Sequence, residues 1–189
     1  MGRIYYLEGS RAVGKTTLLR LIRKHNPGIA VIDGFSRREF NFDMGRWEEF
    51  VLNEQLYLGC AHVQYELLKK SPFHAVIVKG PYTDLYFAKT QARIAFPHND
   101  IMKTPLAEQV DAIERCVPDG IVWLDAPLET ILERCRKDDH VRSTMNTFVS
   151  TWLAGFREHY VEERRASVIN TFAKTPEQVY DEFMRVIQG

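Results

Sequence analysis

The stretch that decides the fold is Gly9-Ser10-Arg11-Ala12-Val13-Gly14-Lys15-Thr16-Thr17, near the start of the chain. It fits the pattern G-x-x-x-x-G-K-[ST] at every fixed position. An apolar run at residues 4–7 precedes it and a helical pattern at residues 18–22 follows it, so we expect a strand, a glycine-rich turn and a helix. In that context the backbone N–H groups of the turn and the positive end of the helix dipole bind phosphate oxygens. A plain turn without a ligand is the alternative.

The ligand expected at this loop is a nucleotide. Lys15 is expected to neutralise the β and γ phosphates of ATP, and the hydroxyl of Thr16 to ligate Mg²⁺. The pattern leaves open whether GTP replaces ATP. The residues expected to bind ATP through the loop are Gly9, Ser10, Arg11, Ala12, Val13, Gly14, Lys15, Thr16 and Thr17.

Length and composition suit one α/β domain over residues 1–189, since the chain is 45% hydrophobic and 26% charged. Lys and Arg number 25, as do Asp and Glu, so the formal charge is zero and nucleic acid is not an expected partner. The cysteines Cys60, Cys116 and Cys135 lack C-x-x-C spacing, which indicates reduced thiols rather than zinc ligands. The sequence shows no signal-peptide pattern and no apolar run of membrane-spanning length. We therefore expect a cytoplasmic protein without a membrane partner.

Strand and helix patterns alternate along the whole chain. This alternation predicts a doubly wound parallel sheet flanked by helices, the architecture of P-loop NTPases. The expected buried strands are residues 4–7, 29–32, 75–78, 121–124 and 168–169, and the main expected helices are residues 16–25, 46–70, 105–113, 128–135, 145–165 and 176–188.

Polar side chains follow the second and third expected strands. Because ligands bind beyond the carboxyl ends of parallel strands, Asp33 is a candidate general base or outer-shell Mg²⁺ ligand. It could instead cap the turn at Gly34. After the third strand, Lys79, Tyr82 and Asp84 are candidates to contact an acceptor substrate, although Asp84 equally suits a helix N-terminus.

A loop and a helix supply the other acceptor-side candidates. Arg37, in the loop after Asp33, could hold an acceptor phosphate or be solvated. On the helix at 46–70, Gln55 and His62 lie two turns apart and share a face, where an amide could read a base edge or simply form the polar edge of the helix. Four further residues extend the apolar surface of this helix, so that it is expected to be largely buried: Leu52, Leu56, Val63 and Leu67.

A charged segment at about residues 134–146 continues from the helix expected at 128–135. Such a run is either a solvated face or an arginine-rich lid that closes over a nucleotide and brings arginines to the transferred phosphoryl group. The lid candidates are Arg134 and Arg136, with Arg142 further along.

Taken together, these segments resemble the thymidylate kinase and deoxynucleoside kinase branch of the P-loop kinases over nearly the full chain. The resembling segments are residues 9–17, the helix around Gln55, residues 82–88, residues 124–129, the arginine-rich segment and residues 168–171. The resemblance implies that Asp33 takes the proton of the acceptor hydroxyl, that Gln55 reads a base, that Arg134 and Arg136 are lid arginines and that the loop after Ile169 borders the donor adenine.

Two departures leave the acceptor open. The family carries Asp-Arg or Glu-Arg-Ser at the end of the third strand, where this chain has Val78-Lys79-Gly80. A lysine supplies charge but cannot form the two parallel bonds that an arginine gives a phosphate. His62 stands where thymidylate kinases hold an arginine toward the monophosphate.

The leading hypothesis is an ATP- and Mg²⁺-dependent kinase that acts on a nucleoside or a nucleoside monophosphate in nucleotide metabolism. In this hypothesis the catalytic residues are Lys15, Asp33, Arg134 and Arg136. One alternative keeps the donor site but phosphorylates another hydroxyl, on a small metabolite or on a modified base in DNA. A further alternative is a nucleotide-binding switch NTPase, for which Asp125 could supply the strand carboxylate. The two long apolar helices could pair across a homodimer or belong to the core.

Overall fold

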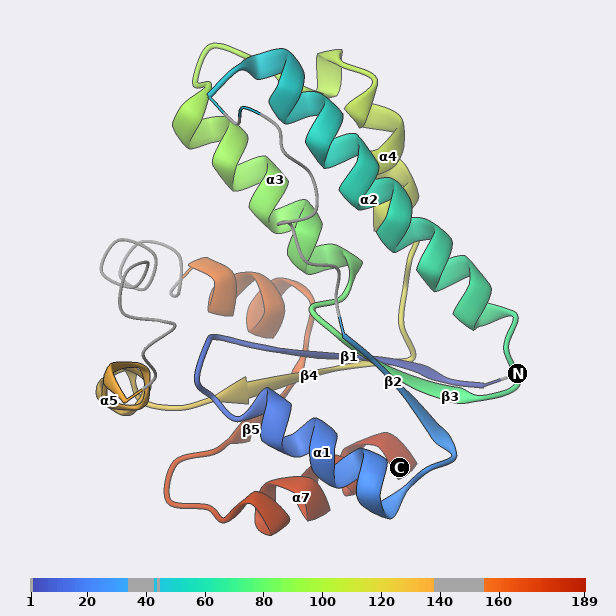
Figure 1. The fold of residues 1–189 in the computed structure, drawn as a ribbon, viewed down its shortest axis with the longest axis vertical. Helices are drawn as coiled ribbons and strands as arrows, with labels where there is room; N and C mark the ends of the chain where they lie inside the picture. The colour runs from blue at the N-terminus through green and yellow to red at the C-terminus, as the bar shows by residue number, and fades with distance from the viewer. Residues whose placement is uncertain (1, 34–42, 44, 138–154) are drawn as a thin grey trace.

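A computed structural model describes residues 2–33, 43, 45–137 and 155–189. At its centre is a five-stranded sheet in which every pair of neighbouring strands is parallel, in the order β2-β3-β1-β4-β5 (Figure 1). The expected doubly wound parallel sheet is confirmed. The strands are β1 (Ile4–Gly9), β2 (Ile29–Asp33), β3 (His74–Val78), β4 (Gly120–Asp125) and β5 (Ser167–Asn170).

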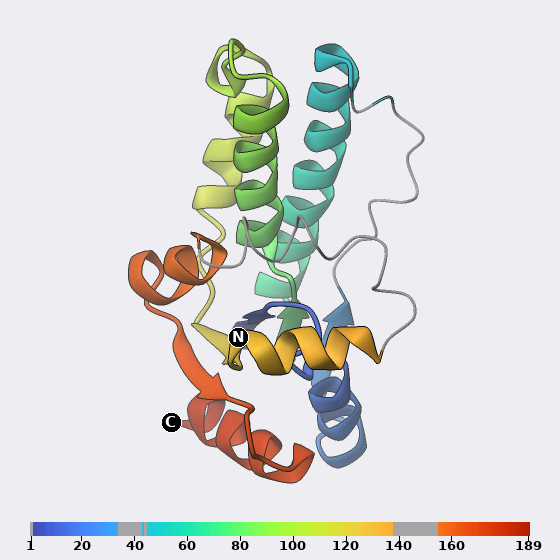
Figure 2. The same cartoon turned by 90° about the vertical axis from the view of Figure 1, so that its left-hand side faces the viewer.

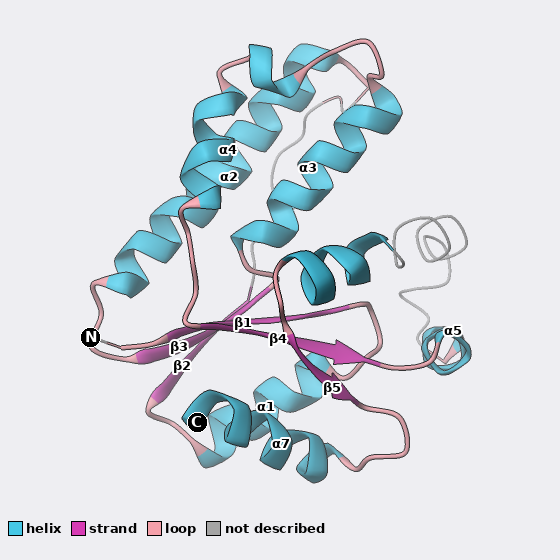
Figure 3. Ribbon diagram, turned by 180° about the vertical axis from the view of Figure 1, so that it is seen from behind, coloured by secondary structure: helices cyan, strands magenta, loops and turns pink. Residues whose placement is uncertain are grey.

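Helices cover both faces of the sheet. In Figure 1 one face carries α1 (Lys15–His25) and α7 (Pro176–Gln188), and the other carries α2 (Trp47–Lys69), α3 (Pro81–Ala95) and α4 (Leu106–Glu114). Helix α5 (Leu128–Arg136) lies at one end of the sheet, and the view from behind in Figure 3 shows the same layers. The short elements are η2 (Ile101–Lys103), between α3 and α4, and η3 (His159–Glu163).

Two clusters of buried side chains fill the space between these layers. Under α2, α3 and α4 the cluster centres on Tyr6, Trp123 and Tyr160, each fully buried. Under α1 and α7 it centres on Leu7, Ile22 and Phe183. Tyr6 and Leu7 are successive residues of β1 that face opposite layers, as alternation along a strand requires. Strand β1 is therefore packed on both faces, and this packing fixes the position from which the following loop starts.

Strand β2 differs from its prediction. The sequence pattern predicts a buried strand, but every residue from Ile29 to Ile32 is only partly buried and Asp33 is exposed. The reason is topological, because β2 is an edge strand that pairs with β3 alone. A run of β-branched residues at a sheet edge looks the same in the sequence as a central strand.

The prediction that four apolar residues bury α2 further is wrong. Leu52, Leu56, Val63 and Leu67 are all exposed, whereas Phe50, Val51, Tyr57, Leu58, Ala61 and Tyr65 form the buried face. Helix α2 thus has one apolar face in the core and another in contact with solvent.

The helix expected at 145–165 is described only from residue 155. Residues 155–158 are helical and continue into η3, and Phe156 and Tyr160 are buried as expected. Within the described parts of the chain, no helix combines the length and apolar character that crossing a membrane requires.

Candidate active site

The phosphate loop joins β1 to α1 at the carboxyl edge of the sheet. Gly9 has a φ of +132°, and a Cβ there would lie 2.4 Å from the carbonyl oxygen of Leu124 on β4, so this position requires glycine. Gly14, with a φ of +99°, is the N-cap of α1, and no side chain caps the helix. The first turn of α1 contains no acidic residue. The free amides and positive dipole end of α1 therefore suit an anion, and the side chains of Thr16 and Thr17 are exposed beside them.

Lys15 turns its amine back into this loop. Its Nζ donates to the carbonyl oxygens of Gly9 at 2.6 Å and Ser10 at 2.5 Å. Burial lowers the pKa of the Lys15 amine to about 7, although the neighbouring Glu8 carboxylate opposes this and Lys79 and Arg11 reinforce it. The amine is therefore close to its own titration midpoint at neutral pH.

Glu8, which the sequence reasoning missed, is the most buried charged group next to the loop, with 1% of its surface exposed. Its carboxylate accepts hydrogen bonds from the Gly80 backbone N–H and from the Thr83 hydroxyl, both at 2.7 Å. The Thr83 hydroxyl also shares a 2.8 Å hydrogen bond with the hydroxyl of Tyr160. Burial raises the pKa of the Glu8 carboxyl to about 7, against the lowering effect of these bonds. In the sequence, the one sign of this buried carboxylate was a single acidic residue at the end of an apolar strand.

Arg134 connects α5 to the other side of the loop. Its guanidinium donates to the carbonyl oxygen of Ala12 at 3.3 Å and to the hydroxyl and carbonyl oxygens of Thr171 at 3.2 and 3.3 Å. A cavity of about 250 Å³ lies here, lined by the loop, Arg134, Thr171, Lys174 and the start of α7. The resemblance places the donor adenine beside the loop after Ile169, and this cavity has that location.

Asp125, at the end of β4, accepts hydrogen bonds through both its carboxylate and its carbonyl oxygen. Its carboxylate accepts from Arg157 Nε at 2.9 Å and from the Ala126 backbone N–H at 3.1 Å. Its carbonyl oxygen accepts from the Thr171 backbone N–H at 2.8 Å. Arg157, which the sequence reasoning also missed, thereby ties the segment before η3 to the sheet.

Asp33 and Lys79 stand at neighbouring strand ends. Asp33 aligns with Val78 of β3, so Lys79 is the next residue along that edge. Asp33 is paired with Arg23 of α1 at 3.3 Å, and both side chains are more than half exposed. Lys79 is exposed and has a φ of +54°, a backbone conformation that non-glycine residues adopt rarely and mostly at functional or strained positions.

The other acceptor-side candidates are placed less uniformly. Gln55 and His62 lie on the same side of α2 and are partly buried. Asp84 occupies the first turn of α3. Tyr82 is 3% exposed and packs edge-on against Tyr6, so its ring belongs to the core.

Arg164 stacks over the Tyr82 ring at 4.0 Å, which closes the Tyr82 side of the core.

Two further predictions fall elsewhere in the chain. Arg37 lies outside the described residues, as does the expected lid beyond residue 137, so both stay predictions. Arg136, the last residue of α5, is exposed.

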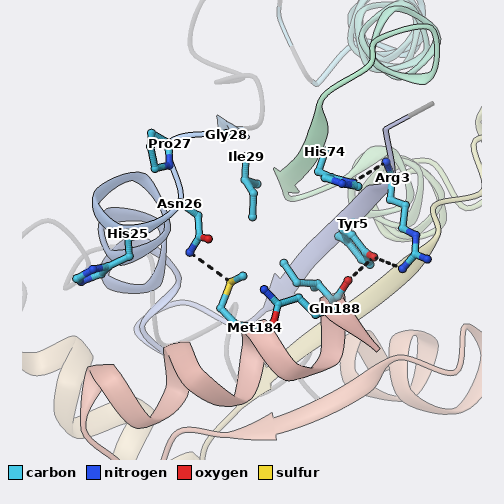
Figure 4. A pocket seen from close by; sticks show the side chains of 11 residues that line it. Arg3, Tyr5, His25, Asn26, Pro27, Gly28, Ile29, His74, Met184 and Gln188 are labelled. Carbon is cyan, nitrogen blue, oxygen red and sulfur yellow. Dashed lines mark hydrogen bonds between the residues drawn. The ribbon is translucent and has the colours of Figure 1, made fainter.

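A second cavity, of about 650 Å³, lies at the opposite edge of the sheet, where the strands begin (Figure 4). It lies between the C-terminal ends of α1 and α7 and is lined by Tyr5, Asn26, His74 and Met184 among others. Its polar groups largely bond one another, as Tyr5 does to Ile187 and Arg3 does to His74. None of the predicted site residues reaches it, so the candidate active site is the phosphate-loop edge.

Comparison by sequence finds no relatives, since no protein-family model and no curated protein matches the chain. Comparison by structure does. The thymidylate kinase of Candida albicans superposes with a TM-score of 0.65 at 18% identity, over 99% of this chain and 91% of that one.

A deoxyadenosine kinase from M. mycoides, solved with bound dATP, superposes with a TM-score of 0.75 at 14% identity, over 98% of this chain and 100% of that one. Its structure with the products dCMP and dCDP gives a TM-score of 0.65, at 14% identity and 98% coverage of both chains.

The sheet order, the loop after β1 and these superpositions define a P-loop NTPase fold. Within that class, the chain has the fold of the nucleoside and nucleotide kinases over nearly its whole length, as the resemblance implied.

Proposed function

We propose that the protein is an ATP- and Mg²⁺-dependent phosphotransferase that moves the γ-phosphoryl group to a nucleoside or a nucleoside monophosphate. The observation that carries this proposal is the uncapped N-terminus of α1, which opens onto a loop whose path beside β4 requires glycine at position 9, because a Cβ there would meet the Leu124 carbonyl oxygen. Lys15 and the exposed hydroxyl of Thr16 stand at that same point. This arrangement suits a polyphosphate with its metal ion.

The donor nucleotide is held by groups already in place. The loop amides and Lys15 bind the phosphates, so that Lys15 exchanges its bonds to Gly9 and Ser10 for phosphate oxygens. The base enters the cavity beside Arg134 and Thr171. Because Arg134 is bonded to both walls of that cavity, its contacts favour a role in holding the donor, and Arg136 is the better candidate to reach the transferred group.

The metal ligands proposed are Thr16 directly and Asp33 in the outer shell. A hydroxyl and a carboxylate are hard oxygen ligands of the kind that Mg²⁺ prefers. When bound, Mg²⁺ neutralises charge on the phosphates. The chain residues do the rest by holding the phosphates and the acceptor in line.

The acceptor is held at the ends of β2 and β3. With a nucleoside as acceptor, Asp33 accepts the proton of the attacking hydroxyl, and Lys79 supplies positive charge beside it. Gln55 and His62 offer hydrogen bonds to a base from the side of α2. Tyr82 acts by packing, since its ring is buried against Tyr6.

The test is transfer of radiolabelled phosphate from ATP with Mg²⁺ to a panel of nucleosides, nucleoside monophosphates, other small hydroxyl compounds and DNA. We expect label on a nucleoside or a monophosphate. Label only on another hydroxyl would support the alternative acceptor, which the Lys79 and His62 departures favour. Phosphate release without an acceptor would support the switch NTPase, although Asp125 is engaged by Arg157.

Arg134→Gln tests the donor cavity separately. Removing a charged fork that makes three hydrogen bonds should raise the KM for ATP roughly tenfold, with a smaller change in kcat. Arg185→Gln, an exposed substitution on α7, is the matched control. A fall in kcat at unchanged KM would move Arg134 to the transferred phosphoryl group instead.

Cytoplasmic location is part of this proposal, supported by three cysteines that form no disulfide. The partners proposed are the donor nucleotide and a small acceptor. A homodimer would depend on a different surface, the outer face of α2.

A further inference from the structure

The helical turn η3 contacts the first turn of α3 at two successive residues. The hydroxyl of Tyr160 shares a 2.8 Å hydrogen bond with the hydroxyl of Thr83, 77 residues away in the chain. The guanidinium of Arg164, just after η3, stacks over the ring of Tyr82. Figure 2 shows the orange turn of η3 beside the end of α3 that meets the sheet. The start of α3, on the proposed acceptor side, is therefore held from η3.

The segment around η3 is itself tied to the sheet. Arg157, just before it, donates to the Asp125 carboxylate at the end of β4. The ring of Tyr160 stacks against Trp123 of β4, with centroids 5.5 Å apart, and its carbonyl oxygen accepts from the Ala166 backbone N–H at 2.9 Å. The turn is π-helical, a rare form that is frequent at functional sites. The Tyr160 hydroxyl thus has a fixed position from which to hold α3.

The protons available along this chain of hydroxyls give it a direction. One oxygen of the Glu8 carboxylate accepts from Thr83 and the other from the Gly80 backbone N–H, both at 2.7 Å. The Thr83 hydroxyl has a single proton, so when it donates to an ionised Glu8 it can only accept from Tyr160. With Glu8 ionised, the hydrogen bonds therefore run from Tyr160 to Thr83 to Glu8.

We propose that Tyr160 is a positioning residue for phosphoryl transfer, whose hydroxyl acts through Thr83 to orient the start of α3 and the turn before it toward the acceptor. This inference rests on the proposed function. That turn contains Lys79 at a φ of +54°, and such a conformation persists only where its surroundings hold it. Gly80 lies against the Tyr6 ring, 2.6 Å from where a Cβ would be, and no side chain caps α3. The hydroxyl chain supplies the missing support.

The first test removes the Tyr160 hydroxyl and keeps its ring. Tyr160→Phe should lower kcat about tenfold and raise the KM for the acceptor, with the KM for ATP within about twofold of the parent, because misplaced reacting groups cost rate rather than donor binding. Tyr65→Phe is the matched control, since Tyr65 is also buried and its hydroxyl also makes one bond, to the Val117 carbonyl oxygen at 2.6 Å. It should lower the thermal midpoint similarly and leave kcat unchanged.

The second test changes the middle of the chain. Thr83→Ser keeps the hydroxyl and should keep kcat within about threefold of the parent. Thr83→Val leaves Glu8 and Tyr160 each one partner short, so kcat should fall about 10- to 100-fold. In the Thr83→Val background, Tyr160→Phe should lower kcat by less than about twofold more, because the link is already broken. Losses that multiply independently would show that the two hydroxyls do not act as one chain, and would overturn the proposal.

Amide hydrogen exchange of the full chain, measured by NMR, needs no substrate. Exchange at Gly80 and Thr83 should be about tenfold faster in Tyr160→Phe than in the parent, and not in Tyr65→Phe. Unchanged exchange at both amides overturns the positioning role. So does an active parent in which Tyr160→Phe loses no more kcat than Tyr65→Phe. A parent that transfers phosphate to no acceptor instead overturns the proposed function, and the exchange rates then decide separately whether Tyr160 holds this turn.

Discussion

Around the phosphate loop, Lys15, Glu8 and Arg134 each make two or more hydrogen bonds. The groups that they contact lie at the end of β1, in the phosphate loop itself, in the turn between β3 and α3, in α3 and in the loop after β5. At the ends of β2 and β3, in contrast, Asp33 is more than half exposed and its pairing with Arg23 comes from a neighbouring surface helix. The donor half of the proposed site is thus built before any ligand binds. In the acceptor half, by contrast, the charged side chain of Asp33 is exposed and is held by one surface ion pair.

This difference separates two kinds of specificity. A prebuilt phosphate cradle suits one chemical feature, the polyphosphate, that different nucleotides share. An exposed acceptor side is completed by the substrate, so small sequence changes such as Lys79 in place of an arginine alter what it accepts. The predictions below test whether the two halves separate in this way.

The largest effect is expected from substitution of Asp33, because the substitution removes a proposed chemical role and not only a contact. Asp33→Asn should lower kcat by about 10² to 10⁴, as loss of a general base does, with little change in the KM for ATP. Steady-state kinetics with the acceptor found in the panel measure both. Arg23→Gln breaks the same ion pair but keeps the carboxylate, and should change kcat by less than about threefold. Equal losses in both variants would mean that Asp33 acts only through the pair.

Lys15→Ala should lower kcat by about 10² to 10³, the usual loss when a preorganised charge at a developing anion is removed. Lys24→Ala, in the last turn of the same helix, is the matched control. Phosphoryl transfer within twofold of the parent in Lys15→Ala would contradict the donor half altogether.

The stability of the donor half should depend on pH through Glu8 and Lys15. The folded pKa of Glu8 is raised to about 7, so ionisation favours the unfolded chain and stability falls as pH rises from about 4.5 to 7. The folded pKa of Lys15 is lowered to about 7, so the unfolded chain holds more protons above pH 7 and stability rises again toward pH 10. The two groups together give a stability minimum near neutral pH.

Glu8→Gln isolates the first of these effects. Relative to the parent, it should gain on the order of 3 kcal/mol in unfolding free energy between pH 4 and pH 8, measured by urea denaturation. Asp111→Asn, at an exposed position on α4, should show no such trend. A pH-independent difference would mean that Glu8 has the same pKa in the folded and unfolded chains, so that burial does not raise it.

The smallest expected signal is a proton taken up when the donor binds. Because the amine of Lys15 has a pKa of about 7, it is mostly neutral at pH 8, and phosphate oxygens beside it should recharge it. Calorimetry of Mg²⁺-ATP binding in two buffers of different ionisation enthalpy should show uptake of up to about one proton. In Lys15→Arg the guanidinium is always charged, so uptake should vanish.

The sequence predicted the fold and the phosphate loop because both depend on neighbouring residues. The G-x-x-x-x-G-K-T pattern lies between a strand and a helix, and each predicted strand lies within an observed one. What it missed depends on residues far apart. Glu8 meets Thr83, and Thr83 meets Tyr160, across separations of 75 and 77 residues that no local pattern shows.

The error on α2 has a different physical origin. Periodicity shows that Leu52 and Leu56 are apolar, but it cannot tell a broad buried face from two faces with different partners. Likewise Tyr82 looks like a polar site residue, yet its hydroxyphenyl ring fits the core against Tyr6. Whether a side chain with both apolar and polar parts belongs to the core or to a site depends on how it packs, which only the fold reveals.

The bonds of Glu8 have one more consequence. A single carboxylate, one residue ahead of the loop, grips the turn that follows β3 through Gly80 and Thr83. The distance between the phosphate loop and the proposed acceptor side is therefore set by these two hydrogen bonds as well as by strand pairing. Without these hydrogen bonds, the phosphate loop and the turn after β3 could move apart while every strand stayed in register.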